Sequence, residues 1–191
     1  MRRLLLLLLI PLLAACQSEP LYDTEYPVFF TFDTKLHANS LISQLVNHAN
    51  CFLIVSSKLN GRAHTLSISS NNGESETLRI ESEGENRAIG NMGANNSLIL
   101  GCVFGLNMDT NQTDDLYMYV AFDRQCPACL KNRTGTNYPL QWASTANMVV
   151  CNTCQRTYHL LGIGNSSDGY RLKTYRMKYD QTHKIFFVTN Q

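Results

Sequence analysis

The stretch "DLYMYVAFDRQCPACLKN" (Asp115–Asn132) joins an apolar strand-forming run directly to a pair of cysteines. A second pair follows in "MVVCNTCQRTYHLLGIG" (Met148–Gly164), again straight after strand-forming residues. Two residues lie inside each pair, and residues 130–150, 21 in all, lie between the pairs. Because a two-residue gap lets both thiolates reach one metal ion at about 2.3 Å, this spacing predicts a structural metal site. Its ligands would be Cys126, Cys129, Cys151 and Cys154.

Short segments rich in β-branched or aromatic residues recur along the rest of the chain, between clusters of Gly, Asn and Ser. Alternation is clear where Leu66 and Ile68 share one face, as expected for half-buried antiparallel strands. We expect an all-β domain, a small antiparallel sandwich or barrel, with two metal-binding loops (residues 124–132 and 149–159) at its tip. The predicted strands are residues 26–33, 51–57, 64–70, 76–82, 95–104, 115–123, 170–180 and 184–190.

One helix is predicted at residues 36–48, where Leu41, Leu45 and His48 recur at helical spacing. The motif "CPAC" also resembles the CPxC of glutaredoxin-like thiol oxidoreductases, in which the first cysteine begins a helix that lowers its pKa. Here the following residues include a glycine and a proline and show no apolar period, so no helix is expected after Cys126. An enzyme of that class is therefore not predicted.

The N-terminal sequence "MRRLLLLLLIPLLAAC" has two arginines followed by a short apolar run, which is typical of an export signal. "LLAAC" resembles the lipobox of bacterial lipoproteins, so we expect a signal peptide at residues 1–15 and lipidation of Cys16. The alternative is an ordinary secretory signal that leaves Cys16 as a free thiol. Residues 16–26 are expected to be a polar tether, and residues 27–191 one domain. This predicts a protein of the bacterial cell envelope, held by lipid at the outer membrane, on its periplasmic or surface face.

The charge of the chain excludes one class of partner. Its 16 basic and 15 acidic residues almost cancel, so the sequence does not indicate binding to nucleic acid. The expected partners are the membrane, through the lipid, and an envelope protein whose identity the sequence leaves open. No Ser/His/Asp set or phosphate-binding glycine loop is evident, and a catalytic site is not predicted.

Three segments, "YMYVAFDRQCPAC", "VVCNTCQRTYHLLG" and "GYRLKTYRMKYDQTHKIFFV", resemble the cluster-binding part and closing hairpin of Rieske-type domains, especially divergent Rieske-like proteins of the Bacteroidetes group. The likeness covers about residues 95–191 and implies a Rieske-like β fold. Rieske centres have one cysteine and one histidine in each loop, whereas here Cys129 and Cys154 stand at the second positions. Since histidine ligation raises the potential of a Rieske cluster, high-potential electron transfer is not expected.

Several occupants of the four-cysteine site remain open from the sequence. A [2Fe–2S] cluster can be held by four cysteines, but proteins that carry one are usually exported folded, and this signal resembles one for unfolded export. Zinc, which can bind after export, is therefore the predicted cofactor, and two disulfides are a further alternative. His159 could replace a ligand but is interpreted as an ordinary strand residue. Cys51 and Cys102 lie in apolar strands and are either small buried side chains or a disulfide pair.

Overall fold

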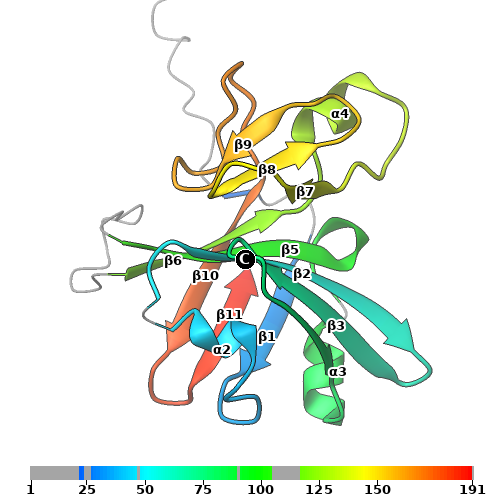
Figure 1. The fold of residues 1–191 in the computed structure, drawn as a ribbon. Helices are drawn as coiled ribbons and strands as arrows, with labels where there is room; N and C mark the ends of the chain where they lie inside the picture. Colours follow the sequence, from blue (N-terminus) through cyan, green and yellow to red (C-terminus); the bar gives the residue numbers. More distant parts are fainter. Residues whose placement is uncertain (1–21, 24–26, 47, 90, 105–116, 191) are drawn as a thin grey trace, which may run out of the picture.

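The computed structural model describes residues 22–23, 27–46, 48–89, 91–104 and 117–190 (Figure 1). The predicted signal peptide, the predicted lipidation site Cys16 and most of the predicted tether lie outside the described residues. Two residues of that tether are described, and they contact the domain, because the Asp23 amide donates to the Thr174 carbonyl at 2.9 Å. In the part of the chain described, no helix has the length and apolar character needed to cross a membrane.

The larger of two sheets is an eight-stranded antiparallel sheet, called here the main sheet. It curls into a half-barrel, so the prediction of a mostly β, antiparallel fold is confirmed (Figure 1). Across the sheet the strands follow the order β1 (Phe29–Asp33), β11 (Ile185–Thr189), β10 (Thr174–Asp180), β6 (Tyr117–Asp123), β5 (Ser97–Phe104), β2 (Cys51–Asn60), β3 (Ala63–Ser70) and β4 (Ser75–Arg79).

The central strands of the main sheet are apolar on both faces, and the reason is that both faces are covered. In β2, Leu53 and Val55 belong to the apolar cluster inside the half-barrel, while Phe52 and Ile54 belong to a second cluster on the opposite face. β3 lies nearer the edge, and its buried residues Leu66 and Ile68 alternate with polar ones. The sequence patterns therefore report whether one or two faces of a strand are packed.

Two short helices cover the open side of the half-barrel. Helix α3 (Glu83–Ile89) contacts both β1 and β3, which lie toward opposite edges of the main sheet. The Phe29 amide at the β1 edge donates to the Asn91 carbonyl at 3.1 Å, just after α3. Helix α2 (Leu41–Gln44) buries Leu41 and Ile42. A 3-10 turn, η1 (Ala94–Asn96), leads into β5.

The predicted helix at residues 36–48 is mostly wrong, since only the one-turn helix α2 forms there. Ser40 is the N-cap of α2, because its Oγ accepts from the Ile42 amide, so the helix begins only at Leu41. Before it, the His37 carbonyl accepts from Ser43 Oγ at 2.7 Å, which satisfies that carbonyl without a helix. Helix α3 was not predicted, and the strand expected at residues 76–82 ends at Arg79. Beyond it the chain turns, because the Asn86 side chain donates to the Ile80 carbonyl at 3.0 Å.

The second sheet lies in the sequence between β6 and β10, and in space on the outer face of the half-barrel (Figure 1). It is antiparallel and is called the small sheet; its strands are β7 (Leu140–Trp142), β8 (Met148–Cys151) and β9 (Thr157–His159). Together with helix α4 (Pro127–Asn132) it forms the cysteine module, residues 124–172. This module packs on the second apolar cluster and contains the four cysteines of the predicted site.

Candidate metal site

The first cysteine pair lies at the start of helix α4. Cys126 is the residue before the helix, with Pro127 at its first turn, and the Leu130 amide donates to the Cys126 carbonyl at 3.1 Å. The prediction that no helix follows Cys126 is wrong, because Pro127 has the fixed φ of a first helical residue and needs no amide partner there. The helix places Cys129 one turn beyond Cys126, on the same side.

The second pair lies in a tight turn at the end of β8. The Gln155 amide donates to the Cys151 carbonyl at 2.7 Å, and the Cys151 amide donates to the Arg156 carbonyl at 2.9 Å. Gln155 has a φ of 60°, which reverses the chain immediately after Cys154. The segment predicted as a loop at residues 149–159 is therefore a β8–β9 hairpin whose turn carries Cys154.

The structure brings all four sulfurs together, and their Sγ atoms all lie within 4.8 Å of one another. The Sγ atoms of Cys126 and Cys154 are 3.7 Å apart, and those of Cys129 and Cys151 are also 3.7 Å apart. A tetrahedron of sulfurs with bonds of about 2.3 Å to a central ion has edges of about 3.8 Å. The four thiols could therefore hold a metal ion with little rearrangement.

Burial and hydrogen bonding give the four thiols different affinities for protons. Cys126, Cys129 and Cys151 are almost fully buried, and burial raises the pKa of Cys126 and of Cys129. Burial also disfavours the thiolate of Cys154, but hydrogen bonds, first from the backbone amide and side chain of Arg156, lower its pKa to about 6. The lowered pKa of Cys154 favours its thiolate near neutral pH, whereas a cation must displace protons from Cys126 and Cys129 to bind there.

A tyrosine contacts the site from the small sheet. The Tyr158 hydroxyl lies 3.2 Å from Cys126 Sγ, and its side chain is completely buried. Burial, and then the contact with Cys126, raise the pKa of Tyr158. The phenol therefore keeps its proton, and its contact with the sulfur helps to orient Cys126. Tyr158 was not singled out from the sequence, although it lies four residues after Cys154 on the buried face of β9.

A buried carboxylate ties the module to the main sheet at the end of β6. Asp123 accepts hydrogen bonds from the amides of Gln125 at 2.8 Å and Ala94 at 3.1 Å, and from the Tyr175 hydroxyl at 2.8 Å. These donors lie in the module, in the turn before β5 and in β10. Asp123 therefore holds the chain where it leaves the main sheet, three residues before Cys126.

Two further contacts join the cysteine module to β3 and to the turn that follows it. The indole N–H of Trp142 donates to Ser69 Oγ at 3.0 Å, and the side chain of Asn71 donates to Asn147 Oδ1 at 2.7 Å. Arg124 adds a third connection, since its guanidinium donates to Ser56 Oγ at 2.7 Å. The module therefore has a fixed orientation on the half-barrel.

Three residues considered from the sequence lie outside the four-sulfur cluster. His159 is exposed on β9, in agreement with its interpretation as an ordinary strand residue. Cys51 and Cys102 lie in the main sheet, opposite each other. Helix α4, which follows Cys126, does not support the thiol-oxidoreductase alternative. An attacking cysteine needs an exposed thiol of low pKa, whereas Cys126 is fully buried.

Comparison with protein-family models, with curated proteins and with solved structures found no match to this chain. Its function is therefore argued from the site itself.

Proposed function

We propose that this protein is a lipid-anchored component of the bacterial cell envelope whose Rieske-like domain binds one zinc ion through Cys126, Cys129, Cys151 and Cys154. The zinc would be structural, and the protein would serve in binding or assembly with an envelope protein. The observation that carries the proposal is the approach of four thiols to within 4.8 Å of one another, with 3.7 Å separations typical of ligands on a single ion.

The compactness of the cluster favours one ion over a [2Fe–2S] cluster, the alternative cofactor. In that cluster the four cysteines divide between two irons, so thiolates on different irons stand farther apart than two thiolates on one iron. All six distances between the four sulfurs are instead within 4.8 Å. Binding a [2Fe–2S] cluster, with electron transfer as the function, would require the sulfurs that bind different irons to move apart.

The coordination that we propose argues against catalysis at this site. Four protein ligands fill a tetrahedral zinc ion and leave no position for water or substrate. Three of the four thiols are also buried, which separates the ion from solvent. The role that remains is to cross-link helix α4 to the β8–β9 hairpin, and this supports a structural assignment.

The Rieske-like relationship is supported by where the resembling segments fall in the fold. They form β6 with the start of α4, the β8–β9 hairpin, and the β10–β11 hairpin, which pairs with both β6 and β1. The small sheet is thus an insertion between neighbouring strands of a larger antiparallel sheet. The lipid anchor is supported by the "LLAAC" sequence alone.

Metal analysis of protein purified without reducing agent tests the proposal. We expect close to one zinc per chain, no visible absorbance, and four thiols that become reactive when a chelator removes the metal. Stoichiometric iron and sulfide with a visible chromophore would instead assign the electron carrier, and neither metal nor free thiols would assign disulfides. The anchor is tested in parallel, since Cys16→Ser should move the exported protein from the membrane to the soluble fraction.

A further inference from the structure

Two cysteines outside the cluster face each other in the main sheet. Cys51, the first residue of β2, is the register partner of Cys102 in β5. Residues directly opposite in an antiparallel pair point to the same face, and both cysteines belong to, or pack against, the apolar cluster inside the half-barrel. Both are free thiols in this structure.

The spacing of such a pair suits a disulfide. Opposed residues of antiparallel strands have Cα atoms about 4.5–5.5 Å apart, and disulfides join Cα atoms about 4.4–6.8 Å apart. Cys51 begins its strand, and the Asn50 amide just before it donates to the Cys102 carbonyl of β5 at 2.7 Å. This backbone bond holds the start of β2 beside Cys102.

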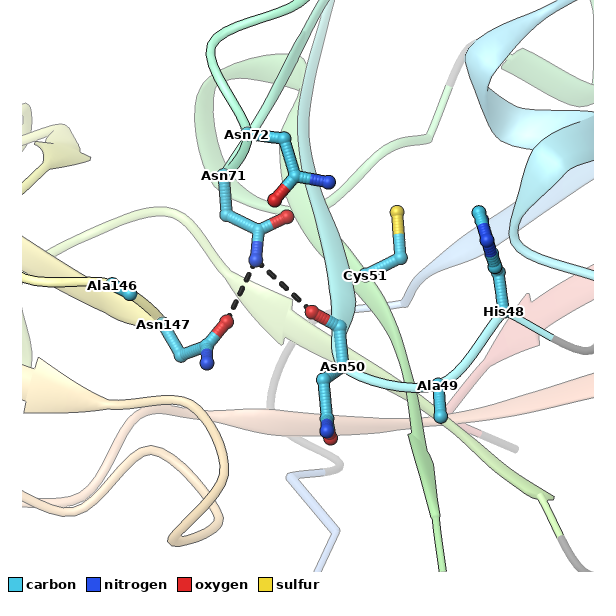
Figure 2. A pocket seen from close by; sticks show the side chains of 8 residues that line it. All are labelled: His48, Ala49, Asn50, Cys51, Asn71, Asn72, Ala146 and Asn147. Carbon is cyan, nitrogen blue, oxygen red and sulfur yellow. Dashed lines mark hydrogen bonds between the residues drawn. The ribbon is translucent and has the colours of Figure 1, made fainter.

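The two thiols differ in their access to solvent. Cys102 is completely buried, whereas Cys51 is half-buried and lines a pocket of about 320 Å³ between the main sheet and the cysteine module. Figure 2 shows the Cys51 side chain among those that line the pocket, between Asn72 and His48 in this view. Of the two cysteines, Cys51 is the one that borders this pocket, and Cys102 does not.

We propose that Cys51 and Cys102 are a disulfide-forming pair, oxidised by a small-molecule disulfide that enters the pocket beside Cys51. The Cys51 thiolate attacks one sulfur of the reagent, forms a mixed disulfide and releases one reagent thiolate. The Cys102 thiolate then attacks the sulfur of Cys51, forms the protein disulfide and releases the second. Two cysteine thiols are oxidised, one reagent disulfide is reduced to two thiols, and these products receive the two cysteine protons.

The pKa values of the two thiols affect the rate of disulfide exchange, and a nearby charge determines which reagents are suitable. Burial, followed by the negative charge of Glu74, raises the pKa of Cys51, and burial with the neighbouring Cys51 raises the pKa of Cys102 to about 11. Few thiolates are present at neutral pH, so the exchange is slow. The nearby carboxylate disfavours anionic reagents, and a neutral disulfide is therefore the appropriate probe.

This pairing also gives each of the seven cysteines a role. Four form the cluster, Cys16 is the proposed lipidation site, and Cys51 and Cys102 are the two that remain. In an oxidising compartment an opposed pair of thiols is expected to become a disulfide. The inference rests on the β2–β5 register and, for the oxidising compartment, on the proposed envelope location, but not on the identity of the metal.

The test treats the purified, metal-loaded protein with bis(2-hydroxyethyl) disulfide, alkylates the remaining thiols after unfolding, and maps the peptides by mass spectrometry. We expect one linked peptide pair joining Cys51 to Cys102, with the cluster cysteines alkylated. In Cys102→Ala, Cys51 should retain one half of the reagent, and in Cys51→Ser, Cys102 should stay unmodified. A matched control, Cys102→Ala with Val103→Cys, moves the thiol one residue to the opposite sheet face and should form no bridge to Cys51.

Several results would overturn the proposal. One is a wild-type protein in which Cys51 carries half of the reagent while Cys102 remains a free thiol. The comparison is made at a reaction time at which Cys51 of the Cys102→Ala variant has reacted fully. Another is an unreactive Cys51 in the folded protein, which would exclude the proposed route through the pocket. Equal linkage in the Val103→Cys control would show that bridging reflects unfolding rather than strand register.

Discussion

The main sheet has strands of five to ten residues around a large apolar cluster, whereas the strands of the small sheet have only three or four. The core of the half-barrel contains large side chains such as Phe30, Phe32 and Phe186, all completely buried. In the cysteine module, three of the buried apolar positions are cysteines of the cluster. The half-barrel therefore has the larger apolar core, and in the cysteine module thiols take the place of part of one.

Strand length explains this difference. An isolated sheet of three very short strands buries too little apolar surface to offset the loss of chain entropy. The small sheet gains part of what it needs by packing on Phe52 and Phe122 of the main sheet. A cross-link between α4 and the β8–β9 hairpin would supply much of the remainder. A metal bound by the four cysteines would thus stabilise a region inserted into a sheet whose own core is a large apolar cluster.

The largest effect should come from removing one cluster cysteine. We expect Cys151→Ser to cost several kcal/mol of stability in the module, because metal binding and folding of a structural site are coupled. Hydrogen exchange should show loss of protection in β7, β8 and β9, while β10 and β11 stay protected. Treatment of the wild type with a chelator should produce the same pattern.

The matched control is Cys102→Ala, measured on reduced protein, because it removes a buried thiol of the main sheet that lies outside the cluster. It should cost about 1 kcal/mol and leave zinc content unchanged. Equal loss of stability in the two variants would contradict a structural metal site. Loss of protection across both sheets in Cys151→Ser would show that the main sheet also depends on the module.

An intermediate effect is expected at the junction of the two regions. Tyr175→Phe removes the hydroxyl that donates to Asp123, and a hydrogen bond to a charged group contributes roughly 1.5–3 kcal/mol. Burial raises the pKa of Asp123, while this hydrogen bond acts in the opposite direction by favouring the ionised form. The stability lost in Tyr175→Phe should therefore be greatest above the pKa of Asp123 and shrink as pH falls through it.

The control for this pH dependence is Tyr179→Phe on the same strand. Its hydroxyl lies 3.3 Å from Thr34 Oγ1, a neutral partner, so the cost should not change with pH over the same range. Denaturant unfolding at several pH values compares the two variants. A penalty for Tyr175→Phe that is constant with pH would show that Asp123 does not change its protonation state there.

How far the sequence could predict this structure depends on how local each signal is. The alternation in β3 reflects one packed face, and the continuous apolar runs of β2 and β5 reflect two. These patterns predicted the strands from the sequence. The cysteine spacing is equally local, and the structure brings those four thiols together. Residues 105–116, between β5 and β6, lie outside the described residues, and they include the first two residues of the strand predicted at 115–123.

The features that were missed depend on contacts between distant segments. Helix α3 forms where it can contact both β1 and β3, which no local pattern records. Helix α4 has six residues, too few to show a repeating apolar pattern, so its only sequence signal was Pro127 after Cys126. The contact of Tyr158 with Cys126 joins β9 to the start of α4. The opposition of Cys51 to Cys102, left open as one alternative from the sequence, arises from strand register. Register is set by the whole sheet and could not be obtained from either strand alone.

The smallest effect should come from the contact between the two sheets at Trp142. Replacing Trp142 by Phe keeps an aromatic ring in the module but removes the N–H that donates to Ser69 Oγ, at a cost of about 1 kcal/mol. Ser69→Ala removes the same hydrogen bond from the main sheet, so the double variant should cost less than the sum of the two single changes. Because the bond orients the module without forming the cluster, zinc content should stay at the wild-type level. Additive costs would mean that the two residues act separately, and loss of zinc in Trp142→Phe would mean that the cluster depends on this contact with the main sheet.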